Sequence, residues 1–255
     1  MYQNIFDSHA HYNGKDFEDR DELLPRLFSS GVCGIIDVAS SMRSTRRTVE
    51  LSARYDTVYS AIGVHPNEVK DMTDEDYETL RELSKLPKVV AIGEIGFDFY
   101  WDASDRDTQR EHFERQLILA RELDLPVIIH SRDAAQETYD LLEKYRPRGV
   151  VHCYSGSAEM AQEILKLGMY IGFTGVVTFK NAKKAVKAAA VVPMDRLLIE
   201  TDCPYMAPEP TRGVRCDSSM LVHTGKKLAE IKGVDLQGLF NQTRQNACEL
   251  FGISL

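Results

Sequence analysis

Eight short apolar runs are spread along this chain of 255 residues, and they limit its fold more than any other feature. Most contain four to six residues and have apolar side chains, often valine or isoleucine, at consecutive positions. The runs are Asn4–Asp7, Gly34–Val38, Val58–Gly63, Val89–Gly93, Val127–His130, Gly149–His152, Met169–Phe173 and Leu197–Glu200. This pattern is typical of strands buried on both faces of one parallel sheet.

Amphipathic stretches with helical periodicity lie between the runs or after the last one. The clearest is Arg106–Leu123, and the others are Asp74–Leu83, Ala158–Leu167 and Leu236–Phe251. Thr73 and Ser157 precede two of them as N-caps. Eight strands alternating with helices predict an α/β fold, a (β/α)8 TIM barrel with residues 1–255 as a single domain. An open doubly wound sheet is the alternative, although the GxGxxG motif of a Rossmann sheet does not follow the first run.

Histidines and acidic residues gather where the predicted strands end. His9 and His11 follow the first run, and residues two apart on a strand point the same way. The other candidates at such ends are Asp7, His65, Glu94, His130, His152 and Asp202. Because the active groups of barrels lie at the carboxyl ends of the strands, these side chains are expected to converge.

Four imidazoles and two carboxylates are too many ligands for one tetrahedral zinc ion, and they suit two cations that share a bridge. The first ion would be held by His9, His11, Glu94 and Asp202. The second would be held by Glu94, His130 and His152, with one oxygen of Glu94 on each ion. We expect divalent ions, among Mg, Mn, Zn and Co. Asp202 and Glu94 are the candidate catalytic residues, and Asp202 would also take the proton of a water activated by the metal.

Further residues are candidates for substrate binding. They are His65, Arg132, Lys180, Arg212 and, with the same chemistry, Arg215. The cationic ones would contact phosphate, or each could be a solvated charge. His65 would orient a phosphate or a ligand, or shape the turn at Pro66.

Other polar and aromatic residues near the predicted site have two interpretations. Asp7 would support a metal-bound imidazole or start a turn. Tyr100 and Trp101 would stack on a nucleobase or pack over the barrel rim. His112 and His223 fall within helical segments and are predicted to be surface or packing residues.

The net charge of -8 argues against a broad basic surface for duplex nucleic acid, but it permits a local positive pocket. No apolar run approaches the roughly 20 residues that span a membrane, and the first residues do not resemble a signal peptide. The five cysteines are scattered without a CxxC motif. We therefore expect a cytoplasmic protein without a membrane partner. The oligomeric state stays open, and a monomer is compatible with the sequence.

Several motifs occur in a fixed order along the chain. They are Asp7–His11 (DSHAH), Ile62–Pro66 (IGVHP), Ile92–Asp98 (IGEIGFD), Val127–Arg132 (VIIHSR), Val151–Gly156 (VHCYSG), Leu198–Tyr205 (LIETDCPY) and Asn246–Ala247. With them, residues 4 to 252 resemble the TatD family of metal-dependent deoxyribonucleases, within the amidohydrolase-like barrels. The resemblance implies a TIM barrel, divalent metals and hydrolysis of DNA phosphodiesters, often as a 3′–5′ exonuclease.

The family's ligand positions fall on the same six residues that the chemistry selects. One segment departs from the family pattern, because Arg215–Ser218 stands where an Asn-x-Pro segment is common. This difference makes the loop over the site, and with it the substrate preference, an open point.

The leading hypothesis is a deoxyribonuclease that acts on single strands or strand ends through a metal-activated water. A second hypothesis is a metal-dependent amide or lactone hydrolase. Many such barrels bridge their metals with a carboxylated lysine, whereas this chain has Glu94 at that strand. A third is a metal-binding scaffold without turnover.

Overall fold

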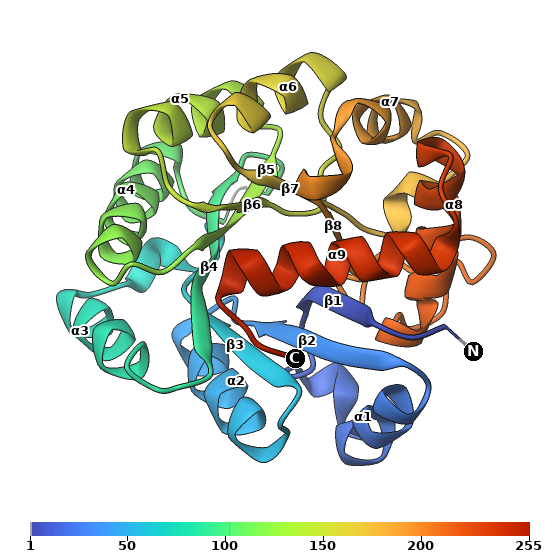
Figure 1. Ribbon diagram of the computed structural model, residues 1–255. Helices are drawn as coiled ribbons and strands as arrows, with labels where there is room; N and C mark the ends of the chain where they lie inside the picture. Colours follow the sequence, from blue (N-terminus) through green and yellow to red (C-terminus); the bar gives the residue numbers. More distant parts are fainter. Residues whose placement is uncertain (1, 102) are drawn as a thin grey trace.

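A computed structural model describes residues 2–101 and 103–255 of the chain. The eight strands form one parallel sheet in which each strand pairs with the next along the chain, as the TIM-barrel prediction requires (Figure 1). The strands are β1 Ile5–Ala10, β2 Val32–Val38, β3 Val58–Ile62, β4 Val89–Asp98, β5 Val127–Arg132, β6 Gly149–Val151, β7 Tyr170–Phe173 and β8 Leu197–Ile199. Past the end of β8, a parallel bridge between Ala10 and Cys203 brings the first and last strands together. The ring is therefore nearly closed.

Helices surround this ring. They are α1 Arg20–Ser29, α2 Met42–Arg54, α3 Asp74–Leu83, α4 Arg106–Glu122, α5 Ala135–Tyr145, α6 Ala158–Lys166, α7 Lys183–Val191, α8 Leu221–Lys232 and α9 Leu236–Phe251. Short 3-10 helices are η1 Lys15–Phe17, η2 Val69–Asp71, η3 Gly175–Thr178, η4 Met194–Arg196 and η5 Ser218–Met220. The described helices do not combine the length and the apolar character needed to cross a membrane.

Local signals set the helix ends. The Ser157 hydroxyl accepts a hydrogen bond from the Met160 amide at the start of α6, and the Asp235 carboxylate accepts one from the Gly238 amide at the start of α9. Helix α9 ends at Gly252, whose φ of 66° is left-handed and costs glycine little. The four predicted helices accordingly differ from the observed ones by at most one residue.

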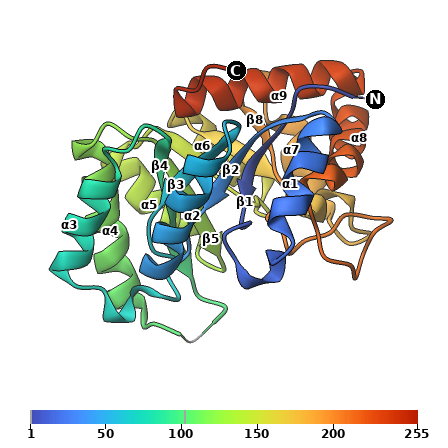
Figure 2. The ribbon, with the colours of Figure 1, turned by 90° about the horizontal axis from the view of Figure 1, so that it is seen from below.

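The apolar core has two parts. One lies between the strands and the outer helices. The other fills the inside of the barrel, with Phe6, Ile36, Ile128, Val150 and Leu198 among its members. Helix α9 and the residues after it add Ala247, Leu250, Phe251 and Ile253 to this inner core. Helix α9 thus lies across one end of the barrel, on the same side as both chain termini (Figure 2).

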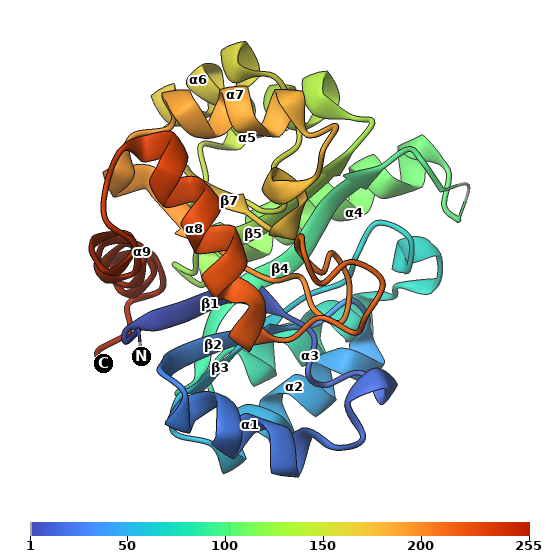
Figure 3. The same cartoon turned by 90° about the vertical axis from the view of Figure 1, so that its right-hand side faces the viewer.

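Strand β4 differs most from the prediction. It continues to Asp98 instead of ending at Gly93, and it reaches toward the side of the molecule away from α9 (Figure 3). Glu94 therefore lies within the strand, where the register with β5 shifts between Ile92 and Ile95. Such a bulge re-aims a side chain. The apolar run in the sequence stops at Gly93 because the next residue, Glu94, is charged and interrupts the pattern.

Candidate metal centre

The six predicted ligands meet at the barrel end opposite α9. His130 and His152 each follow an inner-core residue, Ile128 or Val150, by two positions, so strand alternation turns them inward as well. His9 lies in β1 and Glu94 in β4, while His11 and Asp202 lie just beyond β1 and β8. Their donor atoms form three overlapping groups, each within 4.8 Å: His9–His11–Glu94, Glu94–His130–His152 and His9–His152–Asp202. The predicted convergence of strand-end side chains is thus confirmed for these six residues.

The Glu94 carboxylate lies between two pairs of imidazoles. Its Oε1 is 2.6 Å from His130 Nδ1 and 2.6 Å from His152 Nε2. Its Oε2 faces the other pair, 3.7 Å from His9 Nε2 and 3.9 Å from His11 Nε2. Each oxygen therefore has its own pair of nitrogen donors, which is the arrangement that a bridging carboxylate needs.

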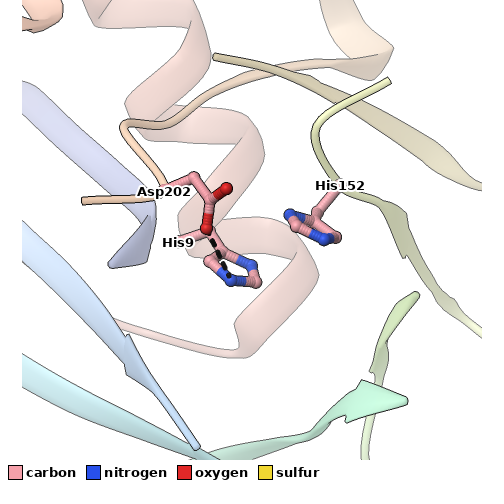
Figure 4. A group of neighbouring side chains, drawn as sticks. All are labelled: His9, His152 and Asp202. Carbon is pink, nitrogen blue, oxygen red and sulfur yellow. Dashed lines mark ion pairs between the residues drawn. The ribbon is translucent and has the colours of Figure 1, made fainter. Parts of the chain in front are cut away.

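His9, His11 and Asp202 form the other half of the site. The Nε2 atoms of His9 and His11 are 3.2 Å apart. Asp202 Oδ1 lies 3.3 Å from His11 Nε2 and 3.7 Å from His9 Nε2. The His152 ring stacks on His9 with centroids 4.0 Å apart, so His9 joins the two halves (Figure 4).

Hydrogen bonds outside the cluster orient two of the imidazoles. His11 Nδ1 is 2.8 Å from the Val38 carbonyl, which can only accept, so His11 Nδ1 carries a proton and its Nε2 lone pair faces the cluster in the neutral ring. His130 Nε2 is 3.1 Å from Asp98 Oδ2 and donates to it, which leaves Nδ1 for the cluster. Metal-ligating histidines are held in this way. The donor set therefore fits divalent cations.

The charges in the cluster oppose the cost of burial. Burial alone would raise the pKa of Glu94, but His152, His65 and His130 hold it well below the usual range, so Glu94 is a carboxylate. Burial lowers the pKa of His9 strongly, while Asp202 and Glu94 overcome burial and raise the pKa of His11 to about 9. The pocket thus combines a fixed anion with at least one neutral imidazole.

Two carboxylates that sequence reasoning missed lie behind the ligands. Asp98 is buried in β4 and bonds to His130. Glu200 is fully buried, accepts hydrogen bonds from the Cys153 amide (2.5 Å) and the Ser8 hydroxyl (3.2 Å), and lies 3.6 Å from His152 Nδ1. Strand alternation was the available signal for both residues. Glu200 lies two positions after the inner-core residue Leu198, and Asp98 lies four positions after Glu94.

A cavity of about 710 Å³ opens over the cluster, a size typical of small-molecule sites. His65 and Arg132 are in its lining, as are Tyr205 and Met206 of the predicted loop after β8. The described lining does not include Lys180 or Arg212, and the Arg212 guanidinium lies 3.7 Å from the centroid of the Phe179 ring. The structure therefore brings two of the five candidate substrate residues, His65 and Arg132, to the site.

Two further expectations change in the structure. Asp7 accepts hydrogen bonds from the Thr201 and Ser218 hydroxyls and from backbone amides, and none from an imidazole side chain among the described contacts. Asp7 thereby connects β1 to the segment after β8. Burial raises the pKa of Asp7 to about 7, although these hydrogen bonds act to lower it.

Arg215 forms an ion pair with Asp19, in which each of two nitrogen–oxygen distances is 2.7 Å. Arg215 is therefore held by Asp19 and does not belong to the described cavity lining.

His112 and His223 lie in α4 and α8, outside the cavity lining, in agreement with their predicted packing or surface role. His112 is buried, with Nδ1 at 2.7 Å from the Tyr77 hydroxyl. A histidine can thus be buried in this fold without serving the site.

Comparison with known proteins agrees with this geometry. Residues 6–252 match the family described as TatD related DNase. The chain belongs to the TatD family. An uncharacterized metal-dependent hydrolase, YabD of Bacillus subtilis, is 42% identical over 98% of this chain and all of that protein.

Two other relatives extend the comparison. A protein of Citrobacter rodentium named 3′-5′ ssDNA/RNA exonuclease TatD is 34% identical, covering 98% of this chain and 99% of its own length. The crystal structure of YjjV, a TatD homolog from Escherichia coli, superposes with a TM-score of 0.94 at 30% identity over the whole of both chains. As a TatD family member, the protein is a metal-dependent hydrolase with a TIM-barrel fold.

Proposed function

We propose that this TatD family hydrolase is a nuclease that removes nucleotides from single strands or strand ends, in the 3′-to-5′ direction. The placement of Glu94 between two imidazole pairs is the observation that carries the proposal. A pair of cations about 3.5–4 Å apart suits an in-line displacement at phosphorus. Relatives named as ssDNA/RNA exonucleases support the same substrate class.

Two divalent ions would divide the donors between them. His9, His11 and Asp202 would hold one, His130 and His152 the other, and Glu94 would bridge. When bound, the ions supply an activated water and positive charge for the phosphodiester. Asp202, whose Oδ1 faces the His9–His11 side, would accept the proton at that carboxylate oxygen.

His65 contributes a hydrogen-bond donor in this proposal. The backbone amide of Asn67 donates to His65 Nδ1 at 3.1 Å, so the neutral ring carries its proton on Nε2. Burial lowers the pKa of His65 to about 3, which keeps the ring neutral. His65 Nε2 lies 3.9 Å from Glu94 Oε1, and we expect this N–H to bind a non-bridging phosphate oxygen.

The acidic surface limits how such an enzyme grips its substrate. With a net charge of -8, binding along a duplex would be opposed by repulsion. If the enzyme holds only a strand end with a few groups in the cavity, its cations neutralise few phosphates. We therefore expect a shallow dependence of affinity on salt.

The proposal is tested by metal reconstitution. Protein stripped with a chelator receives Mg, Mn, Zn or Co, and cleavage of single- and double-stranded DNA and RNA labelled at either end is followed. Stepwise shortening from the 3′ end of single strands is expected with at least one ion. Activity confined to a lactone panel, or no cleavage with any ion, would reject a nuclease.

Asp202→Asn tests the proton-accepting role. We expect the cleavage rate to fall about 100- to 10,000-fold, because general base catalysis contributes that much. Asp195→Asn, at an exposed position before β8 at the other end of the barrel, is the matched control. A rate within a few-fold of the unaltered protein would exclude Asp202 from proton transfer.

A further inference from the structure

Two large aromatic side chains lie in solvent beside the cavity. Tyr100 is 55% exposed and Trp101 is 54% exposed, although aromatic rings of this size are normally well covered. They follow the extended strand β4 with only Phe99 between, and Trp101 is part of the cavity lining. Exposed rings beside a cavity suggest that a bound molecule covers them.

The fold fixes this aromatic turn to the metal cluster through one carboxylate. Asp98 Oδ1 accepts hydrogen bonds from the Tyr100 amide at 3.0 Å and the Trp101 amide at 3.3 Å. The other oxygen of Asp98 accepts from His130 Nε2 at 3.1 Å. The β4–β5 ladder also extends this far, pairing Asp98 with Arg132. The backbone that carries the two rings is therefore held in position relative to His130.

Arg132, at the end of β5, is a cationic neighbour of this aromatic turn. Its guanidinium lies 3.8 Å from the Tyr100 centroid and 5.7 Å from the Trp101 centroid, and the two rings meet edge to face at 4.8 Å. Stacking on a ring leaves the N–H groups of a guanidinium available to a phosphate in its plane. An apolar ring face thus lies beside a cation that is able to bind phosphate.

The same cavity contains both this turn and the donor cluster. Its lining includes Trp101 and Arg132 together with Glu94, His130 and Asp202. The loop after β8 adds Tyr205, which is 58% exposed, to the lining. A chain molecule whose reacting group lies at the cluster can therefore extend to Trp101 without leaving the cavity.

We infer that Trp101, supported by Tyr100 and Arg132, is a stacking platform for an unpaired base of the nucleic acid strand being cleaved. The inference rests on the proposed nuclease function. Every base presents a π face, so such a platform tolerates any sequence. A base inside a duplex has both faces covered by its neighbours, and the platform consequently favours single strands.

Trp101 is the only tryptophan of the chain, so its emission reports the platform directly. The metal-loaded protein is titrated with hexathymidylate made with phosphorothioate linkages, which slow cleavage. A matched oligomer lacks the bases of its two 3′-terminal units. We expect the first to quench Trp101 and the second to quench it much less, with an affinity about 5- to 150-fold lower.

Variants separate stacking from folding. By the anisotropy of labelled oligomers, Trp101→Ala is expected to weaken binding about 5- to 150-fold, and Trp101→Phe far less because a ring remains. In cleavage assays Trp101→Ala should raise KM more than it lowers kcat. Tyr2→Ala is the control, since Tyr2 is an exposed aromatic residue that packs on Phe240 of α9.

The outcomes distinguish the two proposals. If Trp101→Ala binds and cleaves single strands as the unaltered protein does, the platform is wrong and the nuclease function stands. If both oligomers quench equally, binding follows the backbone and the platform is also wrong. If the unaltered protein neither binds nor cleaves any oligonucleotide, the nuclease function and the platform fall together.

Discussion

The two ends of the barrel are built from the same strands but differ in chemistry. At one end, Leu250 and Phe251 of α9 join the apolar residues inside the barrel. At the other end, five histidines and several acidic residues lie at or beneath an open cavity. In β5, only the step from Ile128 to His130 separates the two environments.

The contrast shows how one fold divides stability from function. Burial of apolar side chains under α9 stabilises the barrel. Buried carboxylates such as Glu94 would be costly without the cationic or metal partners that face them. Changes at the α9 end should therefore alter unfolding, whereas changes at the cavity end should alter metal binding and rate.

The largest expected effect is at the cavity end. Glu94→Gln preserves the shape but removes the charge that both imidazole pairs face. We expect at least one ion to be lost and cleavage to fall at least about 1,000-fold, since metal ions contribute several kcal/mol to such reactions. Metal analysis and kcat/KM measure this. Glu249→Gln, exposed on α9, is the control, and two retained ions with full activity would contradict the bridge.

The corresponding change at the α9 end should affect stability alone. Leu250→Ala, at a side chain only 2% exposed, should lower the free energy of unfolding by about 2–5 kcal/mol. Thermal unfolding and the kcat of the folded protein are the measurements. The exposed Gln245→Ala on the same helix should stay within about 0.5 kcal/mol. A loss of kcat in Leu250→Ala without loss of stability would contradict the assignment of stability to the α9 end and activity to the cavity end.

A smaller effect is expected behind the ligands. Asp98→Asn removes the charge that orients His130, and we expect a 10- to 100-fold loss of metal affinity, typical of such outer partners. Competition with a chelator gives the affinity, and the spectrum of the cobalt form reports the ligand geometry. Asp105→Asn, which retains an N-cap on α4, is the control. Unchanged affinity would show that Asp98 serves only the aromatic turn.

The smallest effect concerns a histidine outside the site. Burial lowers the pKa of His112, so the unfolded chain binds its proton more readily. This residue's stability contribution is therefore fully present above the unfolded pKa of about 6.5 and is lost as the pH falls below it. Denaturant unfolding from pH 7 to 5 should show a shallower decline in His112→Gln. An identical slope would contradict a neutral buried His112.

Much of this protein could be predicted from neighbouring residues in the sequence. Apolar runs predicted all eight strands, and capping residues such as Ser157 placed helix ends within one residue. The six donors were recognised because strand alternation and strand ends are local properties. Their convergence followed from the barrel, in which all strand ends meet on one side.

Other features depended on which distant residues became neighbours. The sequence determined the barrel, the six candidate donor residues and the end at which they lie, because these follow from short-range periodicity. Only the tertiary structure decided that β4 continues past Glu94 to bring Asp98 onto His130, and that Arg215 pairs with Asp19 instead of lining the described cavity. Such contacts are set by strand register and ring closure, which join residues far apart in the chain and leave no periodic signal in it.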